Sequence, residues 1–244
     1  MQKYPTLQNF PWSLSVEAIK NSEHFDSYPV FYKNLQANLP INSPQTRVKY
    51  ANVIQRRFFP NRSLDDIATS VWKTYHDDVI LVEIMRTLAL EIEPLIGNFV
   101  TQYILPRTPG SQFDFQVIKD YIIDAYGLLH QDSFRRLSSA LKDMGFLGRY
   151  GKNLYIQPLQ LPANSFLILL HDRLALAPRI VRLSEILENN WWRYLGLRDE
   201  LQVRDILRQA ESVGLIARYS KVDELEQVTT RYTRDEYLQK ALRL

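Results

Sequence analysis

Residues 132–157 read DSFRRLSSALKDMGFLGRYGKNLYIQ, and this stretch decides the fold that the sequence predicts. Phe134, Leu137, Leu141 and Met144 recur at helical spacing, which predicts an amphipathic helix from Asp132 to Met144. Gly145 follows, where a left-handed residue ends many helices. The first half of the stretch is therefore a helix with one apolar face.

The second half of the stretch predicts a β-hairpin. Residues 146–150 and 153–157 are short runs of strand-forming residues, joined at Gly151-Lys152. A further amphipathic helix is predicted before the stretch, beginning at Asp114 and interrupted at Gly127. Helix, turn, helix and hairpin in this order are typical of a winged helix.

The C-terminal part resembles a weaker copy of the same pattern. We expect a helix from Glu200 to Val213, which Gly214 ends, and a hairpin that pairs residues 215–220 with 225–232. Trp191-Trp192 could stack on a base or anchor a partner. Core packing is the favoured interpretation, because large aromatic side chains are mostly buried.

Helices also dominate the N-terminal part. Ser43 and Pro44 predict a helix start, and the helix runs to about Phe59. The apolar stretch 79–105 contains charged residues and Pro94, so it predicts two buried helices rather than a membrane span. Residues 1–40 combine prolines with aromatic residues, and we expect an irregular arm with one short helix over residues 15–21.

The predicted fold is mainly α, with an N-terminal helical bundle followed by winged-helix-like units with short β-hairpins. The linker candidate 106–110 separates the bundle from these units. The predicted segments are an aromatic and proline-rich arm (1–40), the N-terminal helical bundle (41–110), a winged helix (111–160), and a C-terminal helical part with a second winged-helix-like unit (161–244).

Composition narrows the possible functions. Hydrophobic residues make up 45% of the 244 residues, and 30 Lys+Arg stand against 27 Asp+Glu, for a net charge of +3. The chain is therefore no general polycation, and any nucleic-acid interface depends on where the basic residues lie. Because there is no cysteine, disulfides and thiolate metal sites are excluded. With no signal-peptide pattern at the N-terminus, we expect a soluble, cytoplasmic protein.

Catalytic motifs are not found. The four histidines are His24, His76, His130 and His171. His76-Asp77-Asp78 and His171-Asp172 resemble pieces of a metal phosphohydrolase, but adjacent residues on a helix point to different faces, and no His-Glu-x-x-His motif is present. The sequence also contains no phosphate-binding glycine loop followed by Lys and no Gly-x-Ser-x-Gly. We therefore expect a protein that is not an enzyme and has no cofactor, metal or small-molecule substrate.

The strongest functional feature is the polar face of the predicted helix 132–144. Its apolar side holds the helix in a domain, while the opposite side could face the major groove of DNA. The candidate DNA-binding residues here are Arg135, Arg136, Ser139 and Lys142 on the helix and Arg149 and Lys152 in the hairpin. The alternative is a solvated basic face without a ligand.

Two further basic sets could bind phosphates. The first set lies on and after the helix that begins at Pro44, and consists of Arg47, Lys49, Arg56, Arg57 and Arg62. A salt-bridged surface facing Asp65 and Asp66 is its alternative. The second set includes Arg204 and Arg208, but Glu200, Asp205 and Glu211 dilute it, so the C-terminal unit could instead contact proteins.

The residues also resemble a known family. Ser43-Pro44-Gln45-Thr46-Arg47, leading into a helix with Arg56-Arg57, is similar to the opening of BrxA-type proteins of bacterial BREX phage-exclusion systems. The closing run is similar as well, and comprises residues 192–197, Gly214-Leu215-Ile216 and a strand over 227–232. The resemblance spans about Lys33 to Tyr232 and implies a small, mainly helical DNA-binding component of antiviral defence, without catalytic residues.

Taken together, these features predict a non-catalytic protein that binds double-stranded DNA largely through backbone phosphates, in a phage-resistance system with other protein components. One alternative is a protein-interaction scaffold of a defence complex. Another is a winged-helix transcriptional regulator, which would require a symmetric dimer and a palindromic site.

Overall fold

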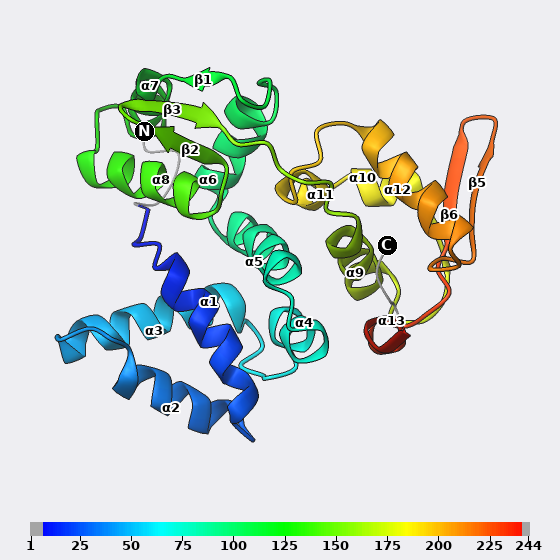
Figure 1. The fold of residues 1–244 in the computed structure, drawn as a ribbon, viewed down its shortest axis with the longest axis horizontal. Helices are drawn as coiled ribbons and strands as arrows, with labels where there is room; N and C mark the ends of the chain where they lie inside the picture. The colour runs from blue at the N-terminus through cyan, green and yellow to red at the C-terminus, as the bar shows by residue number, and fades with distance from the viewer. Residues whose placement is uncertain (1–6, 241–244) are drawn as a thin grey trace. The chain divides into compact units, whose positions relative to one another are not determined.

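The computed structural model describes residues 7–240, which are mainly helical and include two three-stranded antiparallel sheets (Figure 1). The described chain divides into two compact units. The first contains residues 7–73 and 88–159, and the second contains residues 74–87 and 160–240. The linker candidate 106–110 thus lies inside the first unit.

The first unit contains most of the helices up to residue 143 and the first sheet. In chain order the elements up to residue 156 are α1 (Trp12–Asn21), η1 (Ser22–His24), α2 (Tyr28–Asn38), α3 (Pro44–Phe58), α4 (Ile67–Tyr75), α5 (Asp78–Ile92), α6 (Pro94–Phe99), the π-helix η2 (Val100–Ile104), β1 (Gln112–Phe113), α7 (Phe115–Tyr126), α8 (Gln131–Asp143), β2 (Leu147–Tyr150) and β3 (Asn153–Ile156). Residues 74–87, which comprise the end of α4, the connecting residues 76–77 and the first part of α5, belong to the second unit.

The short helix expected over residues 15–21 is found within α1, but the expectation that the rest of the N-terminal arm is irregular is wrong for the described residues. Two helices, α1 and α2, occupy most of residues 12–38. Pro29 does not break α2 because it lies in the first turn, where a missing N–H costs no hydrogen bond. The aromatic side chains of this region pack onto α3 and its exit, with the rings of Phe31 and Phe59 4.9 Å apart.

The predicted start of α3 is confirmed. The Ser43 hydroxyl accepts a hydrogen bond from the Thr46 N–H, 3.3 Å away, and Pro44 occupies the first turn. The apolar stretch 79–105 forms helices with many fully buried residues, as predicted. No helix within residues 7–240 is long and apolar enough to cross a bilayer.

The predicted helix–hairpin stretch folds as α8, β2 and β3. Leu137, Leu141 and Met144 are fully buried, so the apolar stripe of α8 faces the core. Gly145 has a φ of 78°, which permits the sharp turn into β2. Strand β3 pairs with β2 on one side and with β1 on the other. The sequence gives no signal for β1, because a two-residue strand shows no alternation.

The second unit has a similar element order to the first, a helix, a short strand, further helices and a hairpin, but three helices instead of two lie between its short strand and its hairpin. Its elements after residue 160 are α9 (Ala163–Leu174), β4 (Ile180–Arg182), α10 (Leu183–Leu187), α11 (Trp191–Tyr194), α12 (Glu200–Ser212), β5 (Arg218–Val222), β6 (Leu225–Thr229) and α13 (Arg234–Lys240). Strand β6 lies between β4 and β5, as β3 lies between β1 and β2. The predicted C-terminal hairpin is confirmed.

The core of the second unit contains the tryptophan pair. Trp191 and Trp192 are both buried, and the ring of Trp191 stacks on that of Phe166 at 5.1 Å. Their predicted packing role is confirmed. The first turns of α5 add a buried carboxylate, Glu83, which accepts a hydrogen bond from the Ser165 hydroxyl at 2.6 Å.

Candidate nucleic-acid interface

Helix α8 presents three of its predicted DNA-binding side chains on one face. Arg135, Ser139 and Lys142 follow one another at intervals of four and three residues, which places them along one side of a helix. Within residues 7–240, no hydrogen bond or ion pair engages the side chain of Arg135 or Lys142. The Ser139 hydroxyl donates to the Asp143 carboxylate at 3.0 Å. These three residues are called the α8 face below.

Arg136 differs from its neighbour Arg135. Its guanidinium donates to the Leu7 carbonyl at 2.6 Å and lies 3.7 Å from the Asp132 carboxylate. The side chain is only 28% exposed. Arg136 therefore holds the N-terminal segment against α8. It is not the free cation facing a DNA groove that the sequence predicts.

The β2–β3 hairpin ends in basic and aromatic residues. Arg149 and Lys152 are exposed, as the sequence predicts, and Arg149 Nε donates to the Gly151 carbonyl at 2.9 Å. Tyr150, between them, is 81% exposed. Sequence reasoning missed Tyr150, because an aromatic residue in a short strand is normally assigned to the core.

The basic residues of α3 and its exit have different environments. Lys49 and Arg62 are exposed, whereas Arg47 is half-buried and donates to the Ala37 carbonyl. Arg56 is 46% exposed and lies 2.5 Å from a Glu93 oxygen. Only part of this predicted set is therefore available to a phosphate.

Arg57 is a correction to the predicted site. It is 2% exposed, and its guanidinium binds the Glu93 carboxylate through Nε at 2.9 Å and Nη2 at 2.7 Å. It also donates to the Asn9 carbonyl at 3.0 Å and lies over the Phe10 ring. Burial lowers its pKa, while the charge of Glu93 and the hydrogen bond to it raise it. Arg57 is part of the core and cannot reach a phosphate.

A groove of about 420 Å³ runs along α3. It is lined by Gln8, Gln45, Val48, Lys49, Asn52, Val53 and Arg56, and is called the α3 groove below. Two cations and three carboxamides line it, and no carboxylate does, although one of the cations, Arg56, is paired with Glu93 outside the lining. Such a lining suits an anion that accepts hydrogen bonds, since both cations and carboxamide N–H groups donate.

The N-terminal segment 7–9 connects helix α8 and the α3 groove. The Leu7 carbonyl accepts from Arg136 of α8, and the adjacent residue Gln8 lines the α3 groove. Asn9 Nδ2 then donates to the Tyr50 hydroxyl of α3 at 3.0 Å. Leu7 and Gln8 are adjacent residues, and neighbouring Cα atoms are about 3.8 Å apart. The contact with α8 and the lining of the α3 groove are therefore close together in space. The fold thus joins two basic sets that are far apart in the sequence.

In the second unit, the predicted cations of α12 are engaged by carboxylates. Arg204 lies 3.0 Å from Glu200 and 2.8 Å from Glu226, and only 19% of its side chain is exposed. Hydrogen bonds from Arg204 and then Tyr219 lower the pKa of Glu226 to about 2. Arg204 is therefore not available to a phosphate, which corrects its assignment. Arg208 is 58% exposed but pairs with Asp205 at 2.8 Å.

The two hairpins also differ in chemistry. The tip of β5–β6 carries Asp223 and Glu224 between the paired, exposed residues Val222 and Leu225. The equivalent tip of β2–β3 carries Arg149, Tyr150 and Lys152. An acidic tip repels phosphates, so the two units present opposite charges at equivalent positions.

Within residues 7–240, no three His, Asp or Glu side chains are grouped so that they could hold a metal ion. Comparison with family models, with curated proteins and with solved structures finds no match to this chain. A functional assignment therefore depends on the geometry of these residues.

Proposed function

We propose that this protein binds double-stranded DNA without catalysing a reaction on it, largely through backbone phosphates and by its first unit. The observation that carries the proposal is the connection of helix α8, through Arg136, to the α3 groove by residues 7–9. A single duplex could then contact both surfaces, with α8 in the major groove and the α3 groove on a backbone.

The element order supports this proposal. Strand β1, helices α7 and α8 and the β2–β3 hairpin follow the order of a winged helix, in which the second helix enters the major groove. The groove is about 12 Å wide and admits one helix. Arg135 and Lys142 would meet phosphates or base edges, and Lys152 would reach a neighbouring phosphate from the hairpin.

The second unit favours a different partner. Its α12 cations are paired and its hairpin tip is acidic and apolar, so we assign it to protein contacts rather than to DNA. This makes an interaction scaffold the second candidate function. Given the resemblance to BrxA-type proteins, we propose that its partners are other components of a phage-defence system.

Binding to fluorescent duplexes tests the proposal. The intact protein is titrated against two duplexes of unrelated sequence at about 50 and about 200 mM salt. We expect both duplexes to bind, with an affinity that falls steeply with salt. Each of Arg135→Ala, Lys142→Ala and Lys49→Ala should lower the slope of log affinity against log salt by about one.

Arg208→Ala is the matched control. It also removes one positive charge from an exposed helical site, but from the second unit. It should leave the affinity and the slope unchanged. If it weakens binding as much as Arg135→Ala does, net charge explains the binding and the site is wrongly placed. No binding at low salt would overturn DNA binding itself and favour the scaffold.

A further inference from the structure

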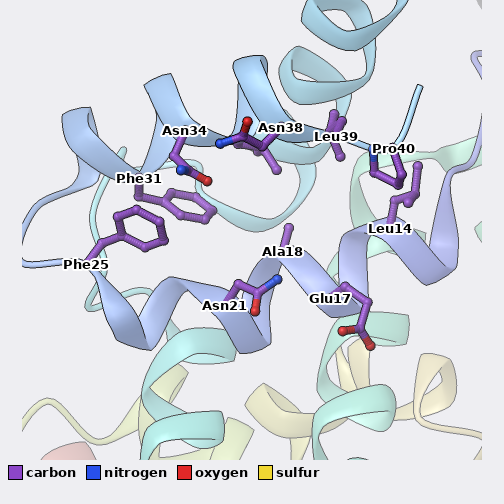
Figure 2. A pocket seen from close by; sticks show the side chains of 11 residues that line it. Leu14, Glu17, Ala18, Asn21, Phe25, Phe31, Asn34, Asn38, Leu39 and Pro40 are labelled. Carbon is purple, nitrogen blue, oxygen red and sulfur yellow. The ribbon is translucent and has the colours of Figure 1, made fainter. Parts of the chain in front are cut away.

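A second groove lies between α1 and α2 in the first unit and has a different lining. It encloses about 320 Å³. Figure 2 shows Asn34 and Asn38 projecting from α2 and Asn21 and Glu17 from α1, with the rings of Phe25 and Phe31 at one end. The groove therefore combines an apolar interior with a rim of carboxamides, and Glu17 lies at its outer edge, with its carboxylate pointing away from α2 in Figure 2.

The charge of this groove argues against nucleic acid. Glu17 is the one charged residue in its lining, whereas the α3 groove contains two cations and no acid. Within residues 7–240, no hydrogen bond or ion pair engages the side chains of Glu17, Asn34 or Asn38. A ligand complementary to this groove is neutral or positively charged, since a phosphate would be repelled by Glu17.

The spacing of the carboxamides fits an extended peptide. Asn34 and Asn38 are four residues apart on one helix, which advances about 6.0 Å. Two residues of an extended chain advance about 6.4–6.8 Å, so the two side chains match successive peptide groups on one side of a strand. Each carboxamide offers a donor and an acceptor, the same pair that a peptide group presents.

We propose that the α1–α2 groove binds an extended peptide segment of a partner protein. Asn34 and Asn38 pair with its backbone, a bulky apolar side chain enters beside Phe25, and a Lys or Arg lies at Glu17. The site is separate from the proposed DNA contacts and does not depend on them.

The test uses the full chain, labelled with ¹⁵N, and the capped peptide acetyl-GKAFAKG-amide as the probe. The peptide has Lys on both sides of Phe, so it suits either chain direction. We expect it to shift the side-chain amide resonances of Asn34 and Asn38. A peptide methylated on alternate backbone nitrogens should bind at least about five-fold more weakly, as expected for one lost hydrogen bond.

Three variants and one control complete the test. Asn34→Ala and Asn38→Ala should each weaken binding about five-fold, and both keep the fold because Ala favours an exposed helix. Glu17→Gln should abolish the preference for this peptide over its Lys-to-Glu analogue. Gln36→Ala removes a carboxamide from α2 that does not line the groove, and should change nothing.

Several outcomes would overturn the proposal. One is the absence of shifts at Asn34 and Asn38 when the peptide is present at about 1 mM. Equal affinity for the N-methylated peptide would exclude backbone recognition. If a DNA duplex, but not the peptide, shifts these resonances, the groove belongs to a nucleic-acid surface. DNA affinity measured on Asn34→Ala should remain that of the unmodified protein, which separates this proposal from the previous one.

Discussion

Arg57 and Glu93 form a buried ion pair, with Arg57 Nη2 2.7 Å from Glu93 Oε1, although 36 residues separate them in the chain. The pair joins α3 to the residue that precedes α6, and Arg57 also binds the Asn9 carbonyl. It therefore ties three parts of the first unit together.

Arg57→Ala should lower the free energy of unfolding by about 3–5 kcal/mol, because it leaves the Glu93 carboxylate buried without its main partner. Urea denaturation measures the loss. Arg56→Ala is the matched control, since Arg56 contacts the same carboxylate from a half-exposed position, and should cost at most about 1 kcal/mol. Equal costs for the two variants would contradict the structural role of Arg57.

Arg136→Ala should release the N-terminal segment from α8, because the hydrogen bond to the Leu7 carbonyl is lost. We expect a stability loss of about 1.5–3 kcal/mol, typical of a hydrogen bond to a charged group. Hydrogen exchange over residues 7–12 should become faster, as mass spectrometry can follow. Arg135→Ala is the control and should leave hydrogen exchange over residues 7–12 unchanged. If exchange becomes as fast in Arg135→Ala as in Arg136→Ala, the contact between Arg136 and Leu7 does not hold this segment.

His171→Phe should remove an acid sensitivity of the second unit. Burial lowers the pKa of His171 from 6.5 to about 4, so the unfolded chain binds its proton more tightly than the folded one. The contribution of neutral, buried His171 to the free energy of unfolding is complete above pH 6.5. It is lost as the pH falls towards 4, and the total loss is about 3 kcal/mol.

Urea denaturation at about pH 7 and about pH 5 measures this difference, since the two values lie on either side of the ordinary histidine pKa. The variant should show a smaller loss between the two than the unmodified protein. His24→Phe, at an exposed position, is the control and should leave the difference in place. A pH dependence that His171→Phe does not change would rule out this histidine as its source.

Glu226→Gln should destabilise the second unit by about 1.5–3 kcal/mol, because Arg204 and Tyr219 lose a charged acceptor. The low pKa of Glu226, about 2, means that its contribution is present above pH 4.5 and is lost as the pH falls towards 2. Thermal denaturation at about pH 7 reports the loss. Glu224→Gln, at the exposed tip of the same hairpin, should have little effect, and equal losses would show that hairpin charge alone matters.

Local sequence determined much of the secondary structure. The apolar stripe of α8, the Ser43 start of α3 and the turn at Gly151-Lys152 are set by interactions between residues at most four positions apart. For that reason several of the helices, among them α3, α7, α8 and α12, both hairpins and the exposed cations Arg135 and Lys152 could be predicted. Pro29 misled the prediction, because its effect depends on its position within the helix.

The tertiary structure alone decided which basic residues are free. Arg57 and Arg136 have the same side chain as Arg135, but their partners, Glu93 and Leu7, lie 36 and 129 residues away. The residue type determines which groups a side chain can bind, whereas the tertiary packing determines which groups lie next to it. A buried cation requires a partner because desolvation is costly, and no local pattern reveals where that partner is.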